Sequence, residues 1–389
     1  MTTRTLPTHP VAVKTHPLWR ALTPLCVMVF AEFLAMGLPL PVLPLRVHEG
    51  LGFGSFVVGL AIGAQSWLTL LTRHVAGTRS EQQGPQSTAL RGLALSALAG
   101  ALYAVSSLVP SSSVSLAVLL LGRGLLGFGE SLVITSTLAW GVALAGRERS
   151  GLLMAWVGIA MYGALAAGAP LGAWLDARVG FVGVSLAATT APVLGIAGAL
   201  LATPVAPMGG ARLPFYRVVS LIWLPGAGLT LCALGFGAIA AFATLRFQEE
   251  GWAHAPLAMT SFGAAYVLAR LLFGGLPDRL GGARVAMGSA AVAVLGQISL
   301  WLAPSSEVAV AATALTGLGF SLAFPAFGVE ALRTVPPRSR GAALGAYAAC
   351  FDLTMGVGVP ALGLVVGAFG YAAAFAVGAL AVASFLVAA

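Results

Sequence analysis

Residues 114–145 read VSLAVLLLGRGLLGFGESLVITSTLAWGVALA, an apolar run whose only charged residues are Arg123 and Glu130. A bilayer core about 30 Å thick is crossed by roughly 20 apolar residues in a helix. Inside hydrocarbon, every backbone donor and acceptor must find a partner within the protein, and an α-helix provides one for each. The run therefore predicts a transmembrane helix that carries two charges into the membrane.

The rest of the chain follows the same pattern. Of its 389 residues, 59% are hydrophobic and 8% are charged, which leaves too little polar surface for a soluble globule. We predict an all-α integral membrane protein with twelve transmembrane helices in two pseudo-symmetric six-helix bundles. The other eleven apolar runs cover residues 20–44, 56–75, 87–109, 151–175, 180–202, 218–246, 256–275, 284–303, 307–332, 341–366 and 370–388.

The composition of the loops divides the chain and orients it. Residues 203–217 contain three prolines and two glycines, and they predict a cytoplasmic linker. The linker separates bundles at residues 20–202 and 218–389, and residues 1–19 form a cytoplasmic tail. If the N-terminus is cytoplasmic, 16 of the 20 Lys and Arg residues fall on that side. This bias indicates an even number of spans with both termini inside the cell.

The two halves also resemble each other at constant sequence offsets. An offset of 190 superposes Gly127 on Gly317, Gly129 on Gly319, Gly168 on Gly358, Pro170 on Pro360 and Gly180 on Gly370. An offset of 197 superposes Arg73 on Arg270, Gly77 on Gly274, Glu81 on Asp278 and Gly84 on Gly281. Parallel repeats of six helices are typical of transporters that bind substrate between two bundles.

Matched polar segments follow the second span of each half. Residues 274–282 read GGLPDRLGG, and residues 77–84 read GTRSEQQG. The glycines allow a tight reversal at the membrane face, and the acid can pair with arginines or with a helix N-terminus. Ion pairs of this kind can break and form again when the two bundles rock against each other.

These segments resemble the G-x-L-x-D-R-x-G loop of the major facilitator superfamily, closely in the second half and loosely in the first. Arg123 to Gly129 resembles the R-x-x-x-G-x-G pattern that this family associates with proton coupling. Gly163 and the stretch Gly168 to Gly172 are similar to the glycine-proline motif of its drug:proton antiporters, although the spacing differs. The resemblance covers nearly the whole chain, and it is greatest to the bacterial YfcJ and YhhS branch.

The resemblance implies a secondary transporter in a bacterial inner membrane that works by alternating access. It implies conformational gating loops formed by Arg73, Gly77, Glu81, Gly84, Arg270, Gly274, Asp278, Arg279 and Gly281. It also implies helix-bending positions at Gly163, Gly168, Pro170, Gly172, Gly358 and Pro360. We expect proton-coupled efflux of a small organic molecule. The alternatives are proton-coupled uptake of a small metabolite and, less favoured, a membrane receptor without transport.

Four charges inside apolar runs predict the site: Glu32, Arg123, Glu130 and Asp352. A charge at this depth costs at least about 2.5 kcal/mol unless it is paired or hydrated, so we expect all four to face a central cavity. Arg123 and Glu130 share a helical face but lie about 10 Å apart along the axis, which disfavours a direct pair. We predict that Glu130 or Asp352 carries the proton and that Arg123 tunes its proton affinity. Glu32 contributes to binding.

Other functional classes fit the sequence poorly. The only lysine, Lys14, is not in a phosphate-binding loop, and the histidines form neither HExxH nor a Cys/His cluster. We therefore expect no enzyme activity, no cofactor and no metal. The net charge of +8 comes from short basic clusters between spans, which indicates solvated loops rather than a nucleic-acid surface. The expected partners are a small-molecule substrate, protons and lipid, and the family resemblance implies a monomer.

Overall fold

Long apolar helices dominate the computed structural model, which describes residues 18–146, 149–207, 215–333, 335 and 340–388. Eleven helices in these ranges are long and apolar enough to cross a membrane, and Ala372–Val387 adds a shorter apolar one. The same ranges contain no strand. The predicted all-α membrane fold is confirmed. Residues 1–17 of the predicted tail and residues 208–214 of the predicted linker lie outside the described residues.

The first half begins with α1 (Leu18–Gly37), which is extended by the short α2 (Leu43–Leu45) and by a π-helical turn, η1 (Arg46–Gly50). Its other helices are α3 (Ser55–Gln83), α4 (Pro85–Leu108), α5 (Ser112–Ala145), α6 (Ser150–Val179) and α7 (Phe181–Leu201). The second half begins with α8 (Phe215–Glu249) and continues with α9 (Pro256–Phe273), the short α10 (Leu276–Leu280), α11 (Gly282–Trp301) and α12 (Ser306–Arg333). It ends with α13 (Arg340–Leu353), a second π-helical turn, η4 (Thr354–Gly358), α14 (Val359–Phe369) and α15 (Ala372–Ala388).

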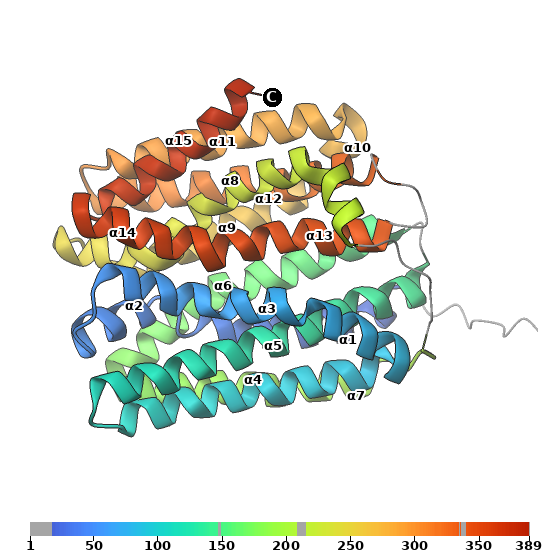
Figure 1. Cartoon of the computed structure of the whole chain (residues 1–389), viewed down its shortest axis with the longest axis horizontal. Coiled ribbons are helices and arrows are strands. Elements are labelled where there is room, and N and C mark those ends of the chain that lie inside the picture. Colours follow the sequence, from blue (N-terminus) through green and yellow to red (C-terminus); the bar gives the residue numbers. More distant parts are fainter. Residues whose placement is uncertain (1–17, 147–148, 208–214, 334, 336–339, 389) are drawn as a thin grey trace, which may run out of the picture.

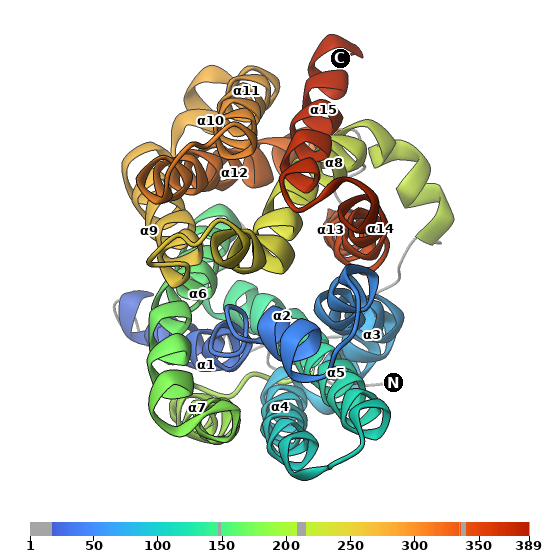
Figure 2. The same ribbon diagram turned by 90° about the vertical axis from the view of Figure 1, so that its left-hand side faces the viewer.

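The helices run roughly side by side and form two groups (Figure 1). Viewed end-on, α1 to α7 occupy the lower part of the molecule and α8 to α15 the upper part (Figure 2). The groups meet along two seams, where α3 packs against α13 and α14, and where α6 packs against α9. Many large apolar side chains remain exposed, such as Leu71 at 67% and Leu194 at 68%. Such a surface is suited to contact with lipid.

Glycines at repeat-related positions have the same structural role in both halves: they form turns or allow two helices to approach closely. Gly84 and Gly281 each turn the chain with a positive φ, +86° and +88°. A Cβ on Gly127 would lie 1.9 Å from the carbonyl oxygen of Gln65, and one on Gly317 would lie 2.2 Å from that of Phe262. Gln65 and Phe262 are themselves 197 residues apart. The repeat therefore extends to matched close approaches between helices, α5 on α3 and α12 on α9.

Two expected local features differ from the structure. Helix α3 continues to Gln83, so Gly77 and Glu81 are helical and only Gly84 makes the turn. No residue between the second span and Gly84 breaks the i to i−4 hydrogen bonding, since glycine alone does not end a helix. Pro170 lies within the single helix α6, whereas Pro360 is the second residue of α14, which begins where the η4 turn ends. The matched prolines therefore do not produce matched local geometry.

Candidate site between the two halves

An ion pair joins the halves at the first seam. Arg73, on α3, donates from Nε to Oδ2 of Asp352, on α13, at 2.6 Å. The side chain of Asp352 is 3% exposed and that of Arg73 is 20% exposed. A charge-assisted hydrogen bond of this length between largely buried groups is strong and directional. Arg73, predicted as part of a gating loop, therefore lies within a transmembrane helix and contacts the opposite half.

Glu130 lies close to this pair on the first half. Its Oε2 accepts hydrogen bonds from Nε2 of Gln65 at 2.7 Å and from Oγ1 of Thr69 at 3.3 Å. Both donors belong to α3, one and two turns before Arg73. Glu130 is half-buried and lies within electrostatic range of Arg73 and Asp352. The carboxyl group thus has neutral donors as direct partners and an ion pair nearby.

Glu32 is more deeply placed. It is 1% exposed on α1, and its Oε1 accepts a hydrogen bond of 2.6 Å from Oγ of Ser96, on α4. Its Oε2 has no partner among the described residues. Glu32 also interacts electrostatically with Glu130. The two acids therefore belong to one polar cluster in the first half.

Arg123 occupies a different place from the one expected of a group that tunes a carboxylate. It is 1% exposed, and it donates to the backbone carbonyls of Ala61 at 3.0 Å and Ile62 at 2.9 Å. Its Nη1 has no partner in the described part of the chain. These bonds tie α5 to α3. No direct pair forms between Arg123 and Glu130, in line with their spacing along the helix.

At the second seam, aromatic rings occupy positions whose repeat equivalents near the first seam are polar. In the internal repeat, the offset of 197 makes Phe262 equivalent to Gln65 and Tyr266 equivalent to Thr69. The offset of 190 makes Phe320 equivalent to Glu130 and Asp352 equivalent to Tyr162. Tyr162, on α6, crosses the second seam and stacks on Tyr266 with ring centroids 3.7 Å apart and an interplanar angle of 23°. The cluster also includes Phe236 and Phe351. A site between the halves would have one polar wall and one aromatic wall.

The second gating segment is also partly buried. Arg270 is 7% exposed at the end of α9, and its Nη2 donates to the hydroxyl of Tyr266 at 2.7 Å. Gly274 caps α9, and Arg279 lies on α10 before the turn at Gly281. The side chain of Asp278 lies outside the described residues. The repeat-related arginines Arg73 and Arg270 therefore lie at the seams between the two halves and not in the loops.

The predicted helix-bending glycines act mainly as contact points. A Cβ on Gly172 would lie 1.8 Å from the carbonyl oxygen of Leu38, and one on Gly168 would lie 2.8 Å from Gly37. These two glycines let α6 approach α1 closely. A Cβ on Gly358 would lie 2.9 Å from Cδ1 of Leu234, whereas one on Gly163 would lie 3.9 Å from Cγ2 of Val267, on α9.

Sequence reasoning missed the neutral partners of the acids. Gln65, Thr69 and Ser96 lie in apolar runs, and their polarity was the available signal. The repeat offsets would also have drawn attention to Tyr162 and Tyr266, since they match Asp352 and Thr69. The repeat offsets do not predict the ion pair between Arg73 and Asp352, because these residues come from different spans of different halves.

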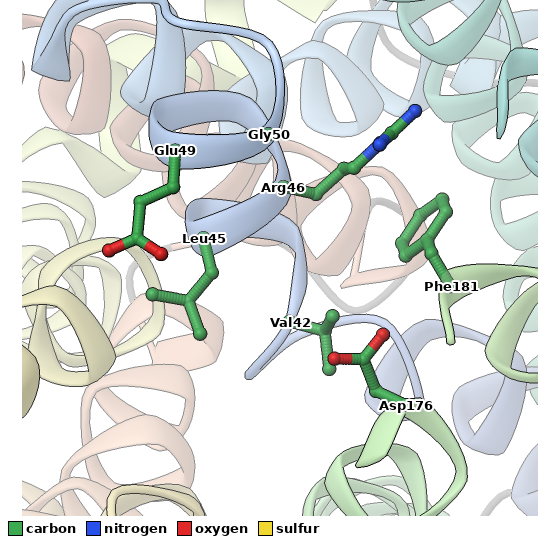
Figure 3. A pocket seen from close by; sticks show the side chains of 7 residues that line it. All are labelled: Val42, Leu45, Arg46, Glu49, Gly50, Asp176 and Phe181. Carbon is green, nitrogen blue, oxygen red and sulfur yellow. The ribbon is translucent and has the colours of Figure 1, made fainter. Parts of the chain in front are cut away.

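A pocket lies elsewhere, at the end of the molecule near α2. Its volume is about 360 Å³, and Figure 3 shows its lining residues, Val42, Leu45, Arg46, Glu49, Gly50, Asp176 and Phe181. The guanidinium of Arg46 lies 5.9 Å from the ring centroid of Phe181. None of the predicted site residues lines this pocket.

Comparisons with known proteins extend over both halves. A family model described as Major Facilitator Superfamily matches residues 25–253 and 226–389. An uncharacterised MFS-type transporter of Burkholderia mallei is 43% identical over 361 residues, which cover 91% of this chain and 88% of that protein. An uncharacterised MFS-type transporter of Salmonella typhimurium is 41% identical over 349 residues, with 89% and 90% covered.

Solved structures share the fold. The nucleoside transporter NupG superposes with a TM-score of 0.74 at 14% identity, covering 95% of this chain and 98% of its own. The human organic anion transporter TETRAN superposes with a TM-score of 0.71 at 17% identity, covering 96% and 99%. At these identities the likeness is one of fold alone.

Proposed function

Because this chain belongs to the major facilitator superfamily, and is a membrane transporter rather than an enzyme, we propose that it exports a small organic molecule in exchange for protons. The observation that carries the proposal is the position of Glu130 beside the Arg73–Asp352 pair at the seam between the halves. A protonatable group there can respond to the state of the contact that joins the halves.

The partners of each acid support different roles. Asp352 has the guanidinium of Arg73 as its direct partner across the first seam, so it serves best as one member of an inter-half latch. Among the described residues, the direct donors to Glu130 are neutral, and its side chain is not fully buried. We assign proton exchange to Glu130 and a supporting role to Glu32. Arg123 fits a positioning role, since it holds α3 through two carbonyls.

Alternating access then follows from charge. When Glu130 is ionised, its negative charge lies within range of Arg73 and competes with Asp352 for it. When Glu130 is protonated, Arg73 is left to Asp352 and the first seam is held together. Proton binding and release at Glu130 would therefore shift the balance between closed and open states of this seam, in the sense of a population shift.

The same proposal includes the topology and the assembly. We infer a monomer in a bacterial inner membrane, with cytoplasmic termini and bundles at residues 20–202 and 218–389 joined by residues 203–217. The Lys and Arg bias supports this orientation. The antiporter-like motif on α6 supports placement near drug:proton antiporters, and we propose the YfcJ and YhhS branch from the sequence resemblance alone.

Everted membrane vesicles test the exchange. Respiration acidifies their interior and quenches a fluorescent weak base, after which amphipathic amines, zwitterions or organic acids are added in turn. We expect at least one compound to restore fluorescence with the wild-type chain, because its entry releases protons. We expect the Glu130→Gln chain to give no response at normal expression. Glu250→Gln, at an exposed acid just after the end of α8, is the matched control.

Two other results of the vesicle assay would contradict the proposal. Deeper quenching on addition of a compound would show that proton and compound move together, which is the uptake alternative. An unchanged response in Glu130→Gln would remove Glu130 from the proton path.

A further inference from the structure

Arg270 has a buried guanidinium group that forms no ion pair with any described residue. It is 7% exposed, its Nη2 donates to the hydroxyl of Tyr266, and its Nε has no partner among the described residues. No carboxylate in the part of the chain that the structure describes forms an ion pair with it. Its head group also lies against the backbone of α6, where a Cβ on Gly158 would be 3.7 Å from Nη2.

The internal repeat offers a comparison between the surroundings of Arg270 and those of Arg73. Arg270 matches Arg73 at an offset of 197, and Tyr162 matches Asp352 at an offset of 190. At the first seam, the second half supplies a carboxylate to the arginine of the first half. At the second seam, the first half supplies the ring of Tyr162 to the neighbourhood of Arg270, where it stacks on Tyr266. Arg270 thus has the repeat position of Arg73, and no acid in the described part of the chain pairs with it.

A buried cation without a counter-charge is costly, and substrate paths are where membrane proteins keep such groups. The guanidinium binds carboxylates better than any other side chain, because its planar donors match both oxygens. The rings beside it are planar and apolar, and the carbon Cζ of Arg270 lies 5.3 Å from the ring centroid of Tyr266. These features together describe a receptor for a flat molecule that carries one negative group.

We propose that Arg270 binds the anionic group of the transported substrate, and that this substrate is an organic anion whose planar part packs on Tyr162 and Tyr266. In the present conformation Nε is covered, so the ligand enters when the contact between α6 and α9 opens. The inference therefore rests on the proposed transport cycle. In that cycle the carboxylate of the ligand takes the place that Asp352 has at the first seam.

Three planar probes of the same size test the charge preference: benzoate, benzamide and benzamidine, which are anionic, neutral and cationic. Binding of radiolabelled benzoate to the purified full chain in lipid nanodiscs is measured by equilibrium dialysis, with the other two as competitors. We expect benzoate to compete at least about tenfold better than either, and Arg270→Gln to lose that preference. Arg91→Gln, at an exposed position, should retain it.

A second pair of variants keeps the test valid if Arg270→Gln fails to fold. Tyr162→Asp places a carboxylate where the repeat has Asp352, so it should pair with Arg270 and exclude benzoate. Tyr162→Asn removes the same ring without adding charge, and it should bind benzoate at least about tenfold better than Tyr162→Asp. Equal benzoate binding by these two variants would overturn the proposal.

The outcomes separate this inference from the exchange mechanism. Equal affinity for the three probes, or no binding of benzoate, overturns the anion site even if vesicles show proton exchange through Glu130. Selective benzoate binding that depends on Arg270 supports the anion site even if Glu130→Gln leaves the exchange intact.

Discussion

Single residues at repeat-related positions give the two seams different chemistry. Asp352 and Tyr162 lie at matched positions on α13 and α6, and each reaches into the opposite half. The contact of Asp352 is ionic and therefore depends on the protonation of its neighbours, whereas the stacking of Tyr162 does not. One seam can thus respond to protons while the other responds to the shape and charge of a ligand.

Removal of one partner of the latch should expose its strength. Asp352→Asn leaves Arg73 mostly buried without its carboxylate, and we expect it to lower the free energy of unfolding by roughly 1–3 kcal/mol, below the range for fully buried pairs because Arg73 is partly exposed. The double variant with Arg73→Gln should recover part of that loss. Thermal unfolding in nanodiscs gives the double-mutant cycle.

A surface pair provides the comparison for this cycle. Arg333 and Glu330 form an ion pair at 3.0 Å with the arginine 62% exposed, so Arg333→Gln should change stability by less than about 1 kcal/mol. Additive effects of Asp352→Asn and Arg73→Gln would mean that the two side chains do not stabilise each other.

Helices approach each other through glycine at the points where the repeat is strictest. Gly127 and Gly317 each face a backbone carbonyl of the neighbouring helix, Gln65 on α3 and Phe262 on α9. A backbone atom cannot rotate away as a side chain can. The spacing of α5 from α3 and of α12 from α9 is therefore set by the absence of a single carbon atom.

Alanine at these two positions should be harmful in both halves. The added Cβ at Gly127 or Gly317 forces the helices apart, and overpacking of this kind costs roughly 1–3 kcal/mol or more. Gly288→Ala is the control, since nothing lies within 4 Å of its Cβ position and alanine favours the helix by about 1 kcal/mol. Melting temperatures of the three variants give the order. A variant at Gly127 as stable as the one at Gly288 would contradict these close approaches.

For the whole molecule, sequence predicted the architecture better than the site. The length of the apolar runs and the repeat offsets predicted the spans and the turns at Gly84 and Gly281, because spans and turns depend on local composition. The pairing of Arg73 with Asp352 was not predictable from spacing, since it requires the two bundles to be docked. The helical continuation of α3 past Gly77 was missed because polarity was read as a loop, although polar residues remain helical when a span extends beyond the membrane.

The orientation of the whole molecule rests on its basic residues and can be tested directly. Short loops rich in Lys and Arg stay in the cytoplasm, and the predicted topology assigns 16 of the 20 such residues to the side of the termini. We expect a green fluorescent protein fused after Ala389 to fluoresce in bacteria. Alkaline phosphatase inserted at Gly251, in the exposed turn between α8 and α9, should be active, because that enzyme matures only outside the cytoplasm. The same insertion at Gly281, at the opposite end of α9 and α10, should be inactive and serves as the control. Active phosphatase at Gly281 with an inactive insertion at Gly251 would invert the topology, and with it the direction in which protons reach Glu130.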